Sequence, residues 1–246
     1  MAAIPLMYAQ EDCELGGKES IEDDFAYRNN VMNADKEIRL AFVRKVYGLL
    51  SVQLMTTVAI ATVLTVIEPV QQFIHRNDWL VLIAFVLSMV TLLALIAKRR
   101  DHPANLYLLA AFTAVQAYTI GVVVSYYNTV IVLQAIAITF AVVFALTLFT
   151  FNTKRDFSFV GYGIVAGLSV LIIGGILQLF IQSSALEIAL SFAGAIFFSF
   201  FLIFDTQQMM TVLSPEEYIL ATINLYMDIL NLFLYILRIL NELNRN

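Results

Sequence analysis

Two aspartates inside the last two apolar segments of this chain are its residues best suited to chemistry. Asp205 ends the run AIFFSFFLIFD, and Asp228 lies within INLYMDILNLFLYIL. An ionised carboxylate in hydrocarbon costs at least about 2.5–3.5 kcal/mol, so such residues face a bundle interior, a partner or an aqueous path. Two of them on consecutive helices predict a shared, titratable site.

Two carboxylates that share a site titrate as a pair. The protonated pair favours a closed, hydrogen-bonded contact, whereas the deprotonated pair favours separation, hydration and entry of a cation. If the two helices are antiparallel, Asp205 lies about 8 Å above the end of its helix and Asp228 about 16 Å above the start of the next. These depths are similar enough for long-range pairing or for a directly shared proton.

The composition sets the class of protein that carries this pair. Of 246 residues, 61% are hydrophobic and 13% are charged, and the mean hydropathy is +0.83. Soluble domains are about 45–50% apolar and about 25% charged, so this composition predicts an all-α, polytopic membrane protein. The lone cysteine, Cys13, excludes an internal disulfide, and no basic patch or motif indicates binding of nucleic acid.

The chain divides into an acidic tail and one membrane domain. Residues 1–35 hold eight of the acids and few large apolar residues, which predicts a disordered cytosolic tail. Residues 36–246 are predicted to form a single bundle of seven transmembrane helices, since about 20 apolar residues cross a bilayer. The spans are expected near 46–67, 79–97, 104–125, 129–151, 160–181, 185–210 and 217–240.

Positive charges predict the orientation of these spans. They gather before the first span and after the second and fourth: Arg44, Lys45, Lys98, Arg99, Arg100, Lys154 and Arg155. Because basic residues favour the cytosolic side, the N-terminus is predicted to be cytosolic. A seventh crossing would place Arg238 and Arg245 on the far side, and a re-entrant last segment would return them. We favour a seventh spanning helix.

The last segment carries a polar stripe along an otherwise apolar helix. Steps of three and four residues meet one face, made of Glu217, Ala221, Asn224, Asp228, Asn231, Tyr235, Arg238 and Glu242. A helix with one such stripe is expected to be central, with the stripe turned towards other helices or water. The stripe predicts either a hydrogen-bond network that holds the bundle together or a functional path, and the buried carboxylate favours the path.

Acids occur at three levels along the predicted axis. Glu187 lies near the lumenal mouth, Asp205 and Asp228 lie inside, and Glu216 with Glu217 lies at the cytosolic mouth. Oxygen ligands suit Ca²⁺, and acidic groups select cations, which predicts weak Ca²⁺ binding at the two aspartates. Two phenylalanines between the upper levels, Phe198 and Phe201, could close such a path by dewetting or could be ordinary packing.

Four segments resemble a known family. They are RLAFVRKVYGLLSVQ at 39–53, FDTQ at 204–207, LSPEEYILA at 213–221 and LYMDILNLFLYILRIL at 225–240. Together they resemble the BAX-inhibitor-motif, or lifeguard, family over all seven spans. The resemblance implies a seven-helix bundle with the last helix central, in Golgi and endoplasmic reticulum membranes. It also implies a pH-sensitive Ca²⁺ leak that lowers stored Ca²⁺ and restrains apoptosis.

The resemblance also implies roles for single residues. The family's di-aspartate sensor falls on Asp205 and Asp228, and its partner arginine on Arg99, which could equally be an ordinary positive-inside arginine. Pore glutamates of this branch fall on Glu187 and Glu216. The polar stripe, independently of the resemblance, offers Asn224, Asn231 and Tyr235 as possible supports. Gln116 stands where relatives carry a glutamate, so a proton or cation role there is in doubt.

Other functions remain open beside the leak channel. A membrane scaffold that suppresses cell death through partners and a proton-coupled Ca²⁺ exchanger both fit the sequence. An intramembrane aspartyl protease does not, because Phe204 precedes Asp205 and no GxGD surrounds Asp228. We therefore expect no enzyme and no cofactor beyond Ca²⁺ as the permeant ion. The lipid bilayer, Ca²⁺ and protons are the expected partners, and apoptosis regulators, Ca²⁺ release channels and a homo-oligomer stay open.

Overall fold

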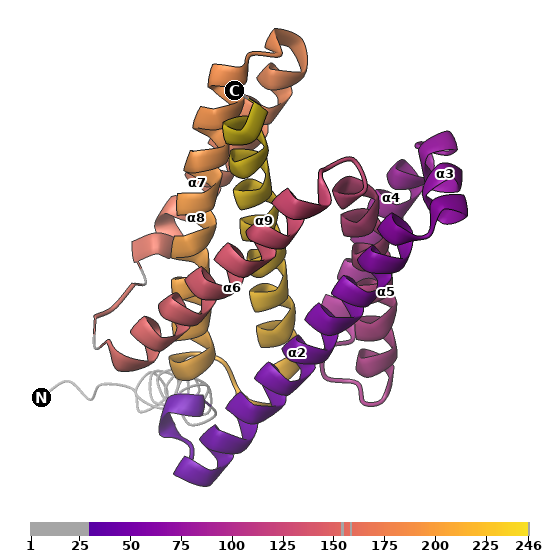
Figure 1. Ribbon diagram of the computed structural model, residues 1–246. Coiled ribbons are helices and arrows are strands. Elements are labelled where there is room, and N and C mark those ends of the chain that lie inside the picture. The colour runs from indigo at the N-terminus through magenta and orange to yellow at the C-terminus, as the bar shows by residue number, and fades with distance from the viewer. Residues whose placement is uncertain (1–29, 154, 158, 246) are drawn as a thin grey trace, which may run out of the picture.

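The computed structural model describes residues 30–153, 155–157 and 159–245, which form helices and turns without a β-strand (Figure 1). Seven of the helices are long and apolar enough to cross a membrane, as the composition predicted. In chain order the elements are η1 Val31–Asn33, α2 Lys36–Val66, α3 Glu68–Arg76, α4 Leu80–Ala97, α5 Ala104–Val124, α6 Thr129–Asn152, α7 Phe159–Ile181, α8 Ser184–Thr211, η2 Pro215–Glu217 and α9 Tyr218–Arg245.

The first membrane helix begins earlier than the apolar pattern indicated. The span was expected from residue 46, whereas α2 starts at Lys36. The added turns carry Arg39, Arg44 and Lys45. Their charges lower the local hydropathy, so the apolar pattern does not include these turns, although Arg and Lys are good helix formers. After α2 the chain forms the short helix α3, which begins with Pro69 in its first turn and buries Ile74.

The short helix η1, Val31–Asn33, lies within the predicted acidic tail. Most of the tail, residues 1–29, lies outside the described part of the chain. Val31 in η1 is buried, with 1% of its surface exposed, and its backbone N–H donates a hydrogen bond to the carbonyl of Leu213 at 2.9 Å. The apolar side chain and the paired backbone explain why the chain is ordered here, where it contacts α2 and α8.

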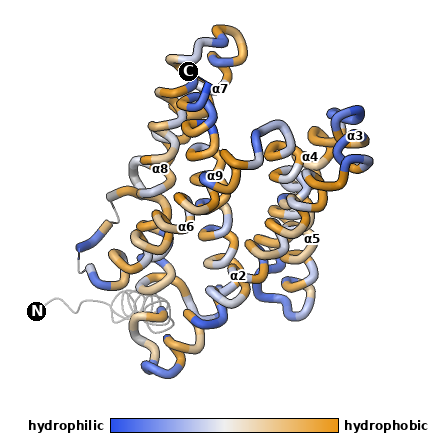
Figure 2. Tube along the Cα trace, viewed as in Figure 1, coloured by the Kyte–Doolittle hydropathy of each residue, from blue (hydrophilic) through white to orange (hydrophobic). Residues whose placement is uncertain are grey.

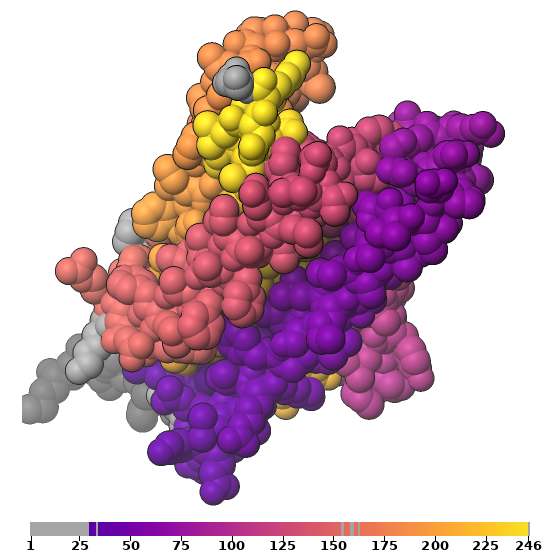
Figure 3. Space-filling view, viewed as in Figure 1, coloured from indigo at the N-terminus to yellow at the C-terminus, as the bar shows by residue number. Residues whose placement is uncertain are grey.

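The last helix is the centre of the bundle, as predicted. Figure 1 shows α9 between α8 on one side and α5 on the other, with α6 and α2 crossing in front, and α9 contacts α8, α6, α2 and α5. In its most apolar stretch 67% of the residues are buried, against at most 44% in any other span. On the face drawn in Figure 3, α2 and α6 cover much of α9.

The helices share two polar ends. Figure 2 shows hydrophilic residues gathered at the turns and apolar residues along the helices. We call the end with the start of α2, the α4–α5 turn and the α8–α9 turn the basic end; it is the end predicted to be cytosolic. α9 is continuous from Tyr218 to Arg245 and reaches the opposite end (Figure 1), which agrees with a seventh span rather than a re-entrant segment.

Candidate functional site

The structure brings the two predicted aspartates together. Asp205 on α8 and Asp228 on α9 lie within hydrogen-bonding and electrostatic range of each other. Asp228 is buried, with 4% of its surface exposed, and its Oδ2 has no hydrogen-bond partner among the described residues. Asp205 is half-buried. The interior of the bundle thus holds a carboxyl pair, which can share one proton or face one cation.

The short α8–α9 turn explains how the pair forms. Pro215 begins η2, and Ser214 Oγ accepts a hydrogen bond from the backbone N–H of Glu216 at 3.4 Å. The turn sends α9 back along α8, and these two helices make the most extensive contact in the fold. Antiparallel neighbours bring similar depths together, so Asp205 near the end of α8 meets Asp228 in the third turn or so of α9.

The polar stripe of α9 contributes less hydrogen bonding than its pattern suggested. Asn231 Nδ2 donates to the Met227 carbonyl within the same helix at 2.8 Å, and the half-buried Asn224 carries no described interhelical hydrogen bond. Other side chains of α9 bond to neighbouring helices, its tyrosines among them. Tyr226 Oη lies 2.8 Å from Thr57 Oγ1 on α2, a contact that the stripe does not reveal.

A layer of aromatic side chains lies between the aspartate pair and the end of the bundle opposite the basic end. Phe198 stacks on the Tyr235 ring at 5.7 Å between centroids, and Phe197 lies 4.8 Å from Phe201. Tyr235 fits because Gly194 has no side chain; a Cβ there would overlap the tyrosine ring. The two phenylalanines considered for a closure therefore belong to one packed aromatic layer.

Filling the space at Gly194 is expected to disturb this layer. Gly194→Ala should lower the free energy of unfolding by about 1–3 kcal/mol, because overpacking forces neighbours from their positions. Thermal melting in detergent micelles measures the effect. Gly48→Ala is the matched control, since nothing lies within 4 Å of a Cβ at that helical glycine. The control should stabilise by about 0.5–1 kcal/mol through backbone entropy. Equal melting of both variants would contradict a tight ring contact.

Glu187 lies far from the aspartates, at the opposite end of the bundle. It is 18 residues from Asp205 along α8, or about 27 Å. It is half-buried and acts electrostatically on Tyr127 in the α5–α6 turn, together with Arg238 and Glu242. Burial raises the pKa of Tyr127, and the nearby Arg238 offsets part of that rise. Glu187 thus lies at the end of the bundle opposite the basic end, away from the aspartate pair.

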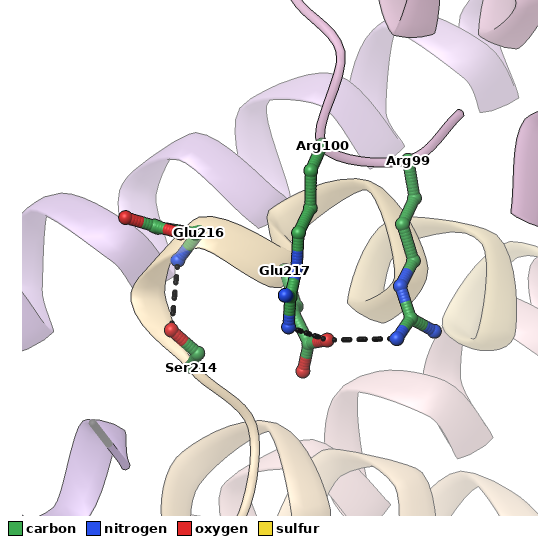
Figure 4. Close-up of polar contacts among 5 residues, drawn as sticks. All are labelled: Arg99, Arg100, Ser214, Glu216 and Glu217. Carbon is green, nitrogen blue, oxygen red and sulfur yellow. Dashed lines mark hydrogen bonds and ion pairs between the residues drawn. The ribbon is translucent and has the colours of Figure 1, made fainter. Parts of the chain in front are cut away.

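Arg99 contacts a different carboxylate from the one the resemblance implied. Its Nη2 lies 3.1 Å from Glu217 Oε1, and Arg100 Nη2 lies 2.9 Å from the same oxygen (Figure 4). Among the described residues no ion pair joins Arg99 to Asp205 or Asp228. The reason is position: Arg99 lies in the α4–α5 turn at the basic end, directly across from η2.

The two adjacent glutamates of η2 play different parts. Glu217 points towards the arginines and only 13% of its side chain is exposed, whereas Glu216 is exposed and points away from them (Figure 4). The sequence singled out Glu216 as the pore residue. Both residues share the same local pattern, so only the packing of η2 against the α4–α5 turn distinguishes them.

Further contacts, most of them buried, attach the α4–α5 turn to the start of α9. Asn105 Nδ2 donates to the Arg99 carbonyl at 3.0 Å and to Tyr218 Oη at 3.2 Å. On the other side of Tyr218, Lys45 Nζ lies 3.4 Å from the ring centroid, a cation–π contact. We call Arg99, Arg100, Asn105, Glu217 and Tyr218 the basic-end latch. It ties the α4–α5 turn to the start of the helix that carries Asp228.

Gln116 has a structural place in this chain. Its Nε2 donates to Ser88 Oγ on α4 at 2.9 Å and approaches Met227 Sδ on α9 at 3.6 Å. Both contacts are buried or partly buried. A neutral amide therefore joins α4, α5 and α9 one residue away from Asp228, at the position where relatives were expected to carry a glutamate.

The aspartate pair is an open arrangement rather than a closed metal cage. Within the described ranges no group of three or more His, Cys, Asp or Glu residues could hold a metal ion. Ca²⁺ takes six to eight oxygen ligands in tight sites, so two carboxyl groups can supply only a part of such a shell. This geometry suits a cation that keeps much of its water.

Comparisons with known proteins place this arrangement in a family. A family model described as "Inhibitor of apoptosis-promoting Bax1" matches residues 39–246. The chain is 42% identical to Protein lifeguard 4 of Mus musculus, over 93% of this chain and 96% of that protein. It is 43% identical to the Golgi anti-apoptotic protein of Vaccinia virus, over 92% and 95%, and 33% identical to Bax inhibitor 1 of Schizosaccharomyces pombe, over 100% and 92%.

The family model covers all seven candidate spans and both aspartates, and only the start of α2 and the residues before it lie outside the match. Several relatives exceed 30% identity over nearly their whole length. The predicted resemblance is confirmed: this seven-helix protein belongs to the BAX-inhibitor-motif family, the inhibitors of apoptosis-promoting Bax1.

Proposed function

We propose that this protein is a pH-sensitive Ca²⁺ leak channel of Golgi and endoplasmic reticulum membranes that lowers stored Ca²⁺ and so restrains apoptosis. The observation that carries the proposal is the carboxyl pair Asp205–Asp228 inside a bundle of apolar helices. The printed names of two relatives, an anti-apoptotic protein of the Golgi and a Bax inhibitor, support the cellular role and the membrane.

Protonation of the pair controls the path in this proposal. With a shared proton, the two carboxyl groups hydrogen-bond to each other and offer little attraction to a cation. Without it, the like charges repel, the site takes up water, and a divalent cation is attracted between them. Ca²⁺ flux should therefore rise as the pH rises through the titration of the pair.

The path needs an entrance and an exit on either side of the aspartates. Glu216 is exposed at the basic end, where it can attract cations to the mouth. Beyond the pair, the aromatic layer of Phe197, Phe198, Phe201 and Tyr235 closes the route towards Glu187. A hydrophobic layer of this kind blocks ions by excluding water. In this proposal the latch and the aromatic layer, on opposite sides of the pair, hold the path closed.

Ca²⁺ entry into proteoliposomes that contain the purified full-length chain tests the proposal. We expect entry to increase as the pH rises and the pair loses its shared proton. Protein-free vesicles and vesicles with heat-inactivated protein are the controls. If the purified protein conducts no Ca²⁺ at any pH but still protects cells from death, the channel proposal is wrong and a scaffold that acts through protein partners is favoured.

A second arrangement of the same assay distinguishes a leak from an exchanger. An opposing proton gradient is imposed across vesicles with equal Ca²⁺ on both sides. A leak dissipates a Ca²⁺ gradient and cannot create one, so no accumulation is expected. Uphill Ca²⁺ movement driven by protons would show that the aspartate pair couples the two ions instead.

A further inference from the structure

Three hydroxyl groups meet where α2, α6 and α8 pack together near the aspartate pair. Tyr47 comes from α2, Thr147 from α6 and Thr206 from α8, and the Tyr47 hydroxyl lies within interaction range of both threonines. The ring of Phe151 lies beside Tyr47, with 6.1 Å between centroids. Thr206 is fully buried, with 0% of its surface exposed. We call these three residues the hydroxyl cluster.

Two members of the hydroxyl cluster lack direct hydrogen bonds. Tyr47 Oη and Thr206 Oγ1 are buried and make no hydrogen bond of good geometry among the described residues, so the approach of the Tyr47 hydroxyl to the two threonines is looser than a direct hydrogen bond. Four other buried threonines, Thr57, Thr113, Thr150 and Thr222, bond back to the carbonyl four residues earlier, whereas Thr139 Oγ1 has no partner among the described residues. The Thr206 hydroxyl does not make this bond, so it stays available to a small polar molecule.

The hydroxyl cluster lies at the level of the aspartates. Thr147 and Thr206 each precede the end of their helix by five residues, at Asn152 and Thr211, and both helices run towards the basic end. This places both hydroxyls about 8 Å from that end. Thr206 directly follows Asp205, so the two residues differ in depth by about one helical rise of 1.5 Å.

We propose that Tyr47, Thr147 and Thr206 form a binding site for ordered water at the level of the aspartate pair. Buried polar groups in proteins are paired with protein or with water, and a site with two to four polar partners is sufficient to hold a water molecule. Each hydroxyl can donate one hydrogen bond and accept two, so the hydroxyl cluster can both donate hydrogen bonds to a water molecule and accept them from it.

The role of this water rests on the proposed function. A cation that approaches Asp205 from the basic end must lose part of its hydration shell, which opposes its entry. Water held by neutral hydroxyls beside the carboxyl pair replaces part of that shell. It also gives the pair a route for exchange of its proton with the solution. The hydroxyl cluster would thus set how readily the pair exchanges ions and protons.

Paired substitutions separate a hydrated site from a dry one. Tyr47→Phe and Thr206→Val, alone and together, remove the hydroxyls with little change in shape. Tyr226→Phe and Thr222→Val are matched controls, because these hydroxyls are buried but bonded within the protein. The first readout is the melting temperature of the full-length protein in detergent. The second is Ca²⁺ entry into proteoliposomes against pH.

If the site holds water, the double variant Tyr47→Phe with Thr206→Val should melt at or below the melting temperature of the natural protein, because the bound water loses its hydrogen-bond partners. A dry site predicts a rise of about 2 °C or more, since the removal of unpaired buried polar groups stabilises a protein. Such a rise would overturn the proposal, whatever the flux shows. In the flux assay the double variant should slow Ca²⁺ entry about threefold to tenfold, the effect of one or two hydrogen bonds on a rate.

The two readouts also separate this inference from the proposed function. If the natural protein conducts no Ca²⁺, the leak fails, and melting alone decides whether the hydroxyl cluster binds water. If the natural protein conducts and the double variant conducts equally well, the hydroxyl cluster has no part in transit and the inference is wrong. Slower flux in the double variant, with natural flux in Tyr226→Phe and Thr222→Val, supports it.

Discussion

Asp228→Asn is expected to abolish the pH dependence of Ca²⁺ entry and to hold the flux at the low value that the natural chain shows at acidic pH. Asparagine keeps the shape of the side chain but cannot ionise, so the like-charge repulsion that separates the pair is lost, and the neutral amide can hydrogen-bond to the Asp205 carboxyl group in either of its protonation states. A unit charge 4 Å from a cation is worth about 4 kcal/mol at an effective dielectric constant of 20. Loss of even a third of this attraction reduces the flux about tenfold.

Controls separate this effect from misfolding. The variant should elute as a single species from a sizing column and melt near the natural temperature. Asp101→Asn is the matched control, because Asp101 pairs only with Lys98 at 3.6 Å and 64% of its side chain is exposed. Asp205→Asn should reproduce the effect of Asp228→Asn, and the double variant should add little, since both residues belong to one site. Natural flux and pH dependence in Asp228→Asn would remove the aspartate pair from the mechanism.

Breaking the basic-end latch is expected to have the opposite effect. Glu217→Arg should raise Ca²⁺ entry about threefold to tenfold at every pH, because it places like charges beside Arg99 and Arg100. A partly buried ion pair of this kind contributes about 1–2 kcal/mol, between exposed and buried pairs. Its loss frees the α4–α5 turn from the start of α9, and the helix that carries Asp228 can then move more easily.

A charge exchange tests whether the contact itself is responsible. Adding Arg99→Glu and Arg100→Glu to Glu217→Arg restores attraction across the same gap, and the flux should return towards the natural value. Asp101→Asn again serves as a control on the same turn. If the Ca²⁺ flux stays high after the charge exchange, Glu217 does not control the flux through its contact with Arg99 and Arg100. A lower flux in Glu217→Arg alone would mean that the carboxylate attracts cations at the mouth.

The architecture of this protein could be predicted from the amino-acid sequence, because the thickness of the bilayer fixes how many consecutive apolar residues each helix needs. About twenty apolar residues are needed for each crossing, and basic residues mark one side. The same arithmetic placed Asp205 and Asp228 at similar depths. The start of α2 could not be predicted in this way, since hydropathy ends where the helix becomes charged while its backbone hydrogen bonds continue.

The tertiary structure alone decided which side chains meet. Glu216 and Glu217 are equivalent in sequence, yet only the packing of η2 against the α4–α5 turn directs Glu217 to Arg99. Tyr47 and Thr206 are 159 residues apart, and their meeting depends on how α2 crosses α8. Depth in a membrane follows from counting residues along one helix, whereas a contact depends on the rotation of two helices about their axes. That rotation is set by the side chains of the whole bundle.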